Sequence, residues 1–194
     1  PVYLDGMIKQ ASAIHSAYPE YLKRSVQRRI LHNDSPFDSH IFQNVDYTRR
    51  KEIVDEGRAI ILAPAGMMSG GPVIDYFKQI CDDEKNALLF TGYQSPSSLG
   101  SKVQRGTKEI ALEDNNGGVK PFKINLRRET IDGLSGHADY NQLLGYYKKV
   151  HPKPERVLSV HGEESRCLNM ARAIGYKFRV ETLAPRNLDS IRLK

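Results

Sequence analysis

Two histidines each lie in a glycine-containing turn that follows an apolar segment. His137 stands in the run Gly133 to Asp139 (GLSGHAD), and His161 stands in the run Ser159 to Glu163 (SVHGE). An imidazole can bind zinc through one ring nitrogen or transfer a proton near neutral pH. In α/β sheets, ligands gather at the carboxyl ends of strands, and glycine lets the backbone approach them closely. A single histidine here is more often a solvated cap residue. Two in the same context favour function, although position alone leaves the two interpretations about equal.

A third candidate is the glycine-rich turn Pro64 to Gly71 (PAGMMSGG), which joins an expected strand to an expected helix. The free N–H groups of such a turn and the helix dipole can hold a phosphate. The turn has no Lys-Ser/Thr ending, which disfavours a Walker-type nucleotide site. The alternative is a tight turn in which Met67 and Met68 pack.

The composition is that of a globular domain. Of the 194 residues, 39% are hydrophobic and 27% are charged, and no apolar run is long enough to predict a membrane span. The net charge of +6 mildly favours a polyanionic partner. Cys81 and Cys167 are too few for a disulfide framework or a thiolate zinc site, so we expect reduced, half-buried thiols and a cytoplasmic protein. The chain starts at Pro1 with a strand-like run and no leader, which suggests an excised fragment.

The first half of the chain alternates expected strands and helices. Ala59 to Ala63 and Ala87 to Thr91 are continuous apolar runs, typical of strands covered on both faces. Short connections between such elements predict right-handed βαβ crossovers and a mostly parallel sheet, hence an α/β fold. The other elements expected here are a strand at Pro1 to Asp5, a helix over Met7 to Leu31 interrupted at Pro19, and helices at Thr48 to Glu56, Val73 to Cys81 and Leu99 to Gln104.

After Gly106 apolar and polar residues alternate around an Asn115 to Gly118 turn, which predicts a hairpin. Two strand–helix units follow, with helices at 139–150 and 164–174 and strands at 156–160 and 178–183. We place a domain boundary near Lys120, which gives domains of residues 1–120 and 121–194.

These motifs together resemble a known family. GLSGHAD followed by SVHGEE is similar to the last two signature motifs of the β-CASP nucleases of the metallo-β-lactamase superfamily. PVYLDGM, APAGMMSGGPVIDYF, LLFTGYQ and LGSKVQRG follow the order and spacing of the archaeal cleavage and polyadenylation specificity factor. The resemblance covers essentially the whole chain. The turn Ser95 to Ser98 departs from the family's usual A-E-G-T, which puts the shape of that loop in doubt.

The resemblance implies a Rossmann-like β-CASP domain in residues 1–120 and the C-terminal strands and helices of a metallo-β-lactamase domain in residues 121–194. It implies a zinc-dependent ribonuclease of the mRNA 3′-end processing or RNA decay type, an endonuclease that could also degrade RNA from the 5′ end. In this family His161 would be a zinc ligand and His137 would assist the leaving oxygen. Asp139 would support His137 or only cap a helix, and the latter is favoured. Phosphate groups of the RNA backbone would contact Ser135, Ser69, Gly70 and Gly71.

The family's H-x-H-x-D-H run, its later histidine and its bridging aspartate are absent from this sequence. We therefore expect two zinc ions in a longer parent protein, but no catalytic zinc and no RNA cleavage in this chain alone. The partner implied is RNA, and no membrane is involved. A homodimer through a C-terminal edge strand at Ser190 to Lys194 is a further expectation. The alternative function, from another class, is a non-catalytic RNA-binding or scaffold subunit.

Overall fold

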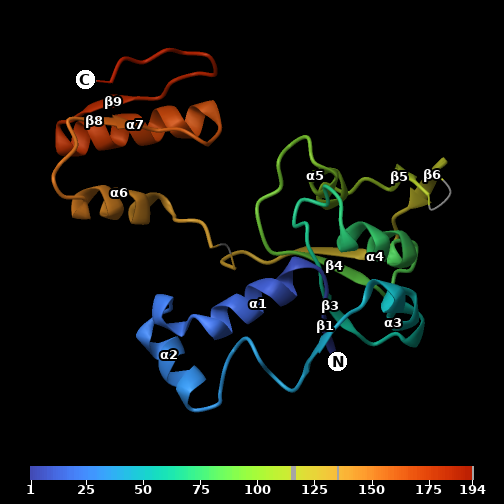
Figure 1. Cartoon of the computed structure of the whole chain (residues 1–194). Helices are drawn as coiled ribbons and strands as arrows, with labels where there is room; N and C mark the ends of the chain where they lie inside the picture. The colour runs from blue at the N-terminus through green and yellow to red at the C-terminus, as the bar shows by residue number, and fades with distance from the viewer. Residues whose placement is uncertain (115–116, 135, 194) are drawn as a thin grey trace. The chain divides into compact units, whose positions relative to one another are not determined.

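The computed structural model describes residues 1–114, 117–134 and 136–193 (Figure 1). The chain divides into two compact units, which we call unit 1 (Pro1–Ser135) and unit 2 (Gly136–Lys194). Among the described residues, unit 1 contains three sheets and two core clusters, and unit 2 contains one sheet and one core cluster.

Unit 1 begins with a three-stranded parallel sheet in the order β2-β1-β3. Buried Tyr3, Val45 and Ile53 form a small core beside it. The long helical segment is interrupted at Pro19, as predicted, because proline cannot donate the backbone hydrogen bond that a continuing helix needs. The elements are β1 (Val2–Leu4), α1 (Met7–Ala17), η1 (Pro19–Tyr21), α2 (Arg24–Leu31), β2 (Phe42–Asn44), η2 (Tyr47–Arg49), α3 (Arg50–Glu56) and β3 (Ile60–Leu62).

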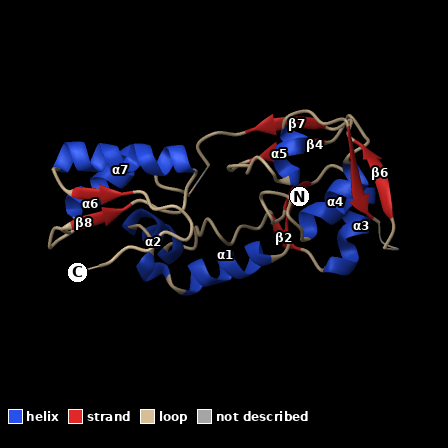
Figure 2. Ribbon diagram, turned by 90° about the horizontal axis from the view of Figure 1, so that it is seen from above, coloured by secondary structure: helices blue, strands red, loops and turns tan. Residues whose placement is uncertain are grey.

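The second part of unit 1 contains a parallel pair of strands, β4 with β7, and the predicted antiparallel hairpin of β5 and β6 (Figure 2). Its elements are α4 (Pro72–Ile80), β4 (Ala87–Phe90), α5 (Leu99–Gln104), β5 (Glu109–Glu113), β6 (Val119–Lys123) and β7 (Arg127–Thr130). The main core of unit 1 lies here and consists of Met68, Phe77, Cys81, Phe90, Val103, Ile124 and Leu126. As expected, Pro72 occupies the first turn of α4.

Two strands were expected to be covered on both faces, and this expectation is wrong. In β3, Ile60 and Leu62 are 60% and 41% exposed, and in β4 Leu89 is 50% exposed. Strand β3 lies at the edge of its sheet, and β4 pairs only with β7 within the described residues. An apolar run shows which residues need cover, but not which segment of the protein supplies it.

Unit 2 consists of α6 (Tyr140–Lys149), β8 (Arg156–Leu158), α7 (Glu164–Phe178) and β9 (Glu181–Leu183). The two strands pair in parallel. Leu144 and Tyr147 of α6 pack with Ile174 of α7. The Tyr147 and Phe178 rings lie 4.6 Å apart between centroids, which continues this core to the end of α7.

The α/β class is confirmed, since three separate sheets contain parallel pairs and helices pack with them. The division between the two units falls after residue 135, because β7 pairs with β4 and so belongs to unit 1. The boundary predicted from the sequence lies near residue 120. That boundary stays a prediction. Both thiols are free; Cys167 is half-buried, as expected, whereas Cys81 is fully buried, because it belongs to the main core of unit 1. Burial raises the pKa of the Cys81 thiol.

None of the helices among the described residues is both long enough and apolar enough to cross a bilayer.

Candidate functional site

His161 lies in the turn between β8 and α7. It follows the carboxyl end of the strand, as the sequence indicated, and its side chain is exposed. Its backbone φ of 65° is in the left-handed region, which few residues other than glycine adopt. At the next position, a Cβ on Gly162 would meet Cys167 Sγ at 3.2 Å, so glycine there lets the turn approach α7 closely.

His137 stands at the start of unit 2, three residues before α6, and is also exposed. The nearby Asp139 is the N-cap of α6. Its carboxylate accepts the N–H of Gln142 at 2.8 Å, while Gln142 Oε1 accepts the N–H of Asp139 at 2.9 Å. This reciprocal capping box is the favoured interpretation of Asp139, and a supporting role towards His137 stays a prediction. Ser135 lies outside the described residues.

The strands that precede the two histidine turns pair within different units, since β7 pairs with β4 in unit 1 and β8 pairs with β9 in unit 2. Both histidines belong to unit 2 because the division between the units precedes His137. Each therefore stands just before a helix of the same small unit, His137 before α6 and His161 before α7.

The described residues do not form a zinc site by themselves. Among them, no group of three or more His, Cys, Asp and Glu side chains lies close enough together to hold a metal ion. Both acidic residues after His161 are paired with arginines, Glu163 with Arg166 at 3.5 Å and Glu164 with Arg186 at 2.9 Å. A catalytic zinc needs about three protein ligands, so His161 would have to act with ligands from outside this part of the protein.

The turn before α4 uses its first helical donors internally. The N–H of Val73 donates to Pro64 O at 3.0 Å, and that of Ile74 donates to Gly71 O at 3.1 Å, while Pro72 has no N–H. A phosphate at this turn would therefore rely on the exposed Ser69 and on the turn itself, not on the end of the helix. The predicted contacts of Ser69, Gly70 and Gly71 stay predictions.

Three arginines of unit 1 form ion pairs with acidic residues of the same unit. Arg29 pairs with Asp34 at 2.8 Å, and Arg49 pairs with Glu52 at 3.1 Å. Arg50 is bound to buried Asp5. These guanidinium groups are therefore less available to an RNA backbone than unpaired arginines would be.

Sequence reasoning also missed a polar cluster that joins β1, α3 and α4. Arg50 donates to both oxygens of Asp5, at 2.8 and 3.2 Å, and also to Asp75, while the Tyr76 hydroxyl donates to Asp5 at 2.9 Å. Asp5 is only 2% exposed. Its burial acts to raise its pKa, but the bonds from Arg50 and Tyr76 outweigh burial and hold the pKa below its ordinary value. Burial, followed by the bond to Asp5, raises the pKa of Tyr76 well above its ordinary value. The one signal in the sequence was a charged residue directly after a buried strand.

Comparison with known families places the chain in a class. The family model of the Beta-Casp domain matches residues 1–103, and the model of the Zn-dependent metallo-hydrolase RNA specificity domain matches residues 121–185. The first match covers more than half of the chain, so the chain belongs to the Beta-Casp family, and the resemblance stated from its motifs is confirmed.

Three relatives carry the name transcription termination factor FttA. The chain is 51% identical to that of Methanococcus maripaludis and 49% identical to that of Methanocaldococcus jannaschii, each over 100% of this chain and 31% of the relative. It is 47% identical to that of Thermococcus kodakarensis, over 100% of this chain and 30% of the relative. The chain thus spans about a third of the length of these relatives.

Proposed function

We propose that this chain is the RNA-binding part of a zinc-dependent ribonuclease that hydrolyses phosphodiester bonds, in which His161 is one zinc ligand and His137 protonates the leaving oxygen. The observation that carries the proposal is the pair of histidine turns in unit 2, inside a region matched by a metallo-hydrolase RNA specificity domain. The remaining zinc ligands, for two ions, would come from a longer protein of the kind represented by the relatives.

The exposure of His137 suits an acid that meets substrate from solvent. A protonated imidazole loses its proton near neutral pH, so it can pass that proton to the departing oxygen and be recharged from water. His161 would act through a ring nitrogen as a fixed donor, and its turn is held between β8 and α7. The two histidines therefore have different roles, and replacing them should change different quantities, bound zinc for His161 and the rate of cleavage alone for His137.

The test separates these tasks in the longer protein. His161→Ala should lower both the bound zinc, measured by mass spectrometry, and RNA cleavage. His137→Ala should keep the zinc and lower kcat by about 10²- to 10⁴-fold, the usual range for a general acid. Loss of zinc in His137→Ala, or full activity in either variant, would contradict the assignment.

For the chain alone we propose that no catalytic zinc is bound and that no RNA is cut. Zinc at one or more ions per chain, together with nuclease activity abolished by His161→Ala, would contradict this. RNA binding by the chain should weaken as salt rises, because phosphate contacts dominate. Binding that is unchanged between low and high salt would count against RNA as the partner.

The second candidate is a non-catalytic RNA-binding or scaffold subunit that acts in transcription termination. It is favoured by the relatives' name, which states transcription termination and not cleavage. The discriminating observation is whether H-x-H-x-D-H precedes Pro1 in the parent gene.

We also propose a cytoplasmic protein that dimerises through Ser190 to Lys194. Sedimentation of the chain with and without that segment tests the dimer, and identical monomer profiles would end the idea.

A further inference from the structure

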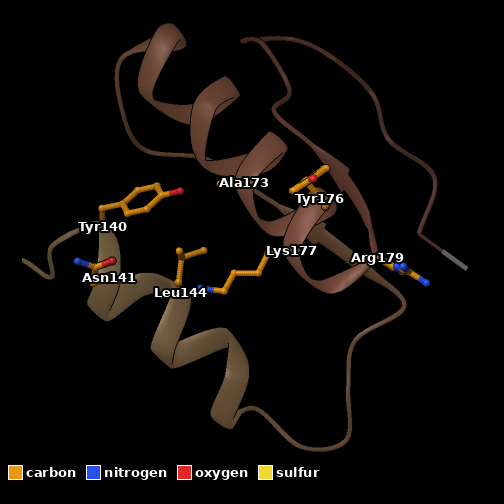
Figure 3. A pocket seen from close by; sticks show the side chains of 8 residues that line it. Tyr140, Asn141, Leu144, Ala173, Tyr176, Lys177 and Arg179 are labelled. Atoms are coloured by element: carbon orange, nitrogen blue, oxygen red, sulfur yellow. The ribbon is translucent and has the colours of Figure 1, made fainter.

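A groove of about 890 Å³ lies between α6 and α7 in unit 2, and none of the site residues assigned above lines it (Figure 3). Its lining residues are Tyr140, Asn141, Leu144, Ala173, Gly175, Tyr176, Lys177 and Arg179. In Figure 3, Tyr140 points from the start of α6 towards α7, and the Lys177 side chain reaches back from the end of α7 towards α6. An aromatic ring and a cation thus face the same space from opposite walls.

The chemistry of the lining favours an anionic, planar ligand. Two of the lining residues are cationic and two are tyrosines, and none is acidic. Within the described part of the chain, Lys177 forms no ion pair. Its Nζ lies 5.9 Å from the centroid of the Phe178 ring. Asn141 adds an amide that can hydrogen-bond the edge of a base.

Local packing keeps the groove open. Ala173 on α7 presents only a methyl group to it, and Leu144 of α6 is buried beneath. Gly175 lets α7 lie against β9, since a Cβ there would meet Thr182 Oγ1 at 2.8 Å. Tyr140 is half-exposed, so its ring is available to a ligand.

We propose that this groove binds one unpaired nucleotide of single-stranded RNA, with the base stacked on Tyr140 and a phosphate held by Lys177. The inference extends the proposed function, because it gives RNA a second site beside the one at the histidines. Tyr140 follows His137 by three residues, a chain length that spans at most about 11 Å. A strand passing His137 therefore needs little length to reach the groove. RNA is the better match than a protein partner, because the lining combines two tyrosine rings with two cations and offers only Leu144 and Ala173 as aliphatic side chains.

The test measures binding, not cleavage, of a short fluorescein-labelled oligouridylate to the 194-residue chain by anisotropy. Tyr140→Leu keeps an apolar side chain but removes the ring, and should raise the Kd by about 5- to 150-fold, the range for loss of one stacked base. Tyr140→Phe keeps the ring and should bind like the wild type. Tyr146→Leu, an exposed tyrosine of the same helix outside the groove, is the matched control.

Lys177→Gln should weaken binding and reduce the steepness of the salt dependence by about 0.7 in log Kd per log salt, as for one lost phosphate contact on a single strand. Lys148→Gln removes the same charge from α6 outside the groove and should leave this slope nearly unchanged. Circular dichroism of each variant establishes that the helices are intact.

The outcomes distinguish the groove from the histidine site. If the chain binds the oligouridylate but Tyr140→Leu and Lys177→Gln bind equally well, the groove is not an RNA site, and the assignment of His137 and His161 is unaffected. If the wild-type chain does not bind at all, the groove inference also fails, while cleavage by the longer protein remains an independent test. A change in sedimentation without a change in RNA affinity would instead make the groove a subunit contact and overturn the inference.

Discussion

The two units use charge in opposite ways. Unit 1 has 18 Lys and Arg residues against 17 Asp and Glu residues, whereas unit 2 has 11 against 6 in less than half the length. Nearly all of the net charge of +6 therefore comes from unit 2. In unit 1 the most buried ion pair, Asp5 with Arg50, connects a strand to a helix of the same unit.

In unit 2 the polar groups of interest face solvent. His137 and His161 are exposed, and Lys177 lines an open groove. A buried charge needs a fixed partner, and removing that partner is costly, whereas an exposed charge is screened by water and remains available to a ligand. The comparison teaches that unit 1 holds its most buried charge in a fixed pair, whereas the groups proposed for recognition in unit 2 are exposed.

The largest effect is expected from Arg50→Ala. This change leaves the carboxylate of Asp5 buried without its cation, which should lower the free energy of unfolding by about 3–5 kcal/mol. Urea denaturation followed by circular dichroism measures it, with hydrogen exchange of β1 peptides to locate the loss in unit 1.

The matched control is Arg49→Ala, one residue earlier. Its pair with Glu52 is about half exposed, so its removal should leave the free energy of unfolding nearly unchanged. Equal losses from the two variants would show that burial does not distinguish these ion pairs, and the contrast between the units would lose its main support.

A second change tests packing in unit 1. A Cβ on Gly100 would lie 1.9 Å from Gln94 Oε1 and 3.0 Å from Met67 O. The Gln94 amide cannot easily withdraw, because its Nε2 donates to Gly66 O at 2.8 Å and to Gly92 O at 3.2 Å. Gly100→Ala should therefore destabilise unit 1 by about 1–3 kcal/mol, as overpacking does. Gly92→Ala, where the new Cβ meets nothing within 4 Å, should have a far smaller effect on the melting temperature.

A smaller effect is expected in unit 2 from Asp139→Ala, which removes the capping box of α6 and should cost about 1 kcal/mol. Faster hydrogen exchange in the first turn of α6 would report it. Asp139→Asn keeps a side-chain acceptor and should largely restore protection. If Asp139→Asn does not restore the hydrogen-exchange protection, the carboxylate has a role beyond capping, and this result would support its proposed role towards His137.

The smallest effect near neutral pH, and a growing one in acid, concerns Asp5. Its folded pKa lies below its ordinary value, so the unfolded chain binds more protons as the pH falls. The stabilisation is fully present above about pH 4, the ordinary pKa of Asp, and is lost as the pH falls through the folded pKa. Hydrogen exchange across an acid series should show this in peptides of β1. Unchanged protection there in acid would contradict it.

The order of elements followed from local rules. Helical spacing of apolar residues, with proline at positions 19 and 72, predicted the break after α1 and the start of α4. The Asn-Gly turn predicted the hairpin of β5 and β6, although Asn115 and Asn116 themselves lie outside the described residues. Motif order predicted the family that the domain match shows. These signals work because each depends on a few residues that are close in the chain.

The misses have one physical origin. Sequence reasoning expected both faces of β3 and β4 to be covered, and they are not. It did not foresee the bonds of Asp5 to Arg50 and Tyr76, nor the facing of Tyr140 and Lys177 across a groove. Each of these depends on contacts between segments that are far apart in sequence, which neither periodicity nor spacing records.

By itself the sequence determined the class of fold, the family and the residue types available for RNA chemistry, because these depend on local patterns and motif order. Only the tertiary structure decided which charges are buried and neutralised in unit 1 and which remain open in unit 2. The reason is that the free energy of a charge depends on the water and partners around it, and folding, not residue type, sets those surroundings.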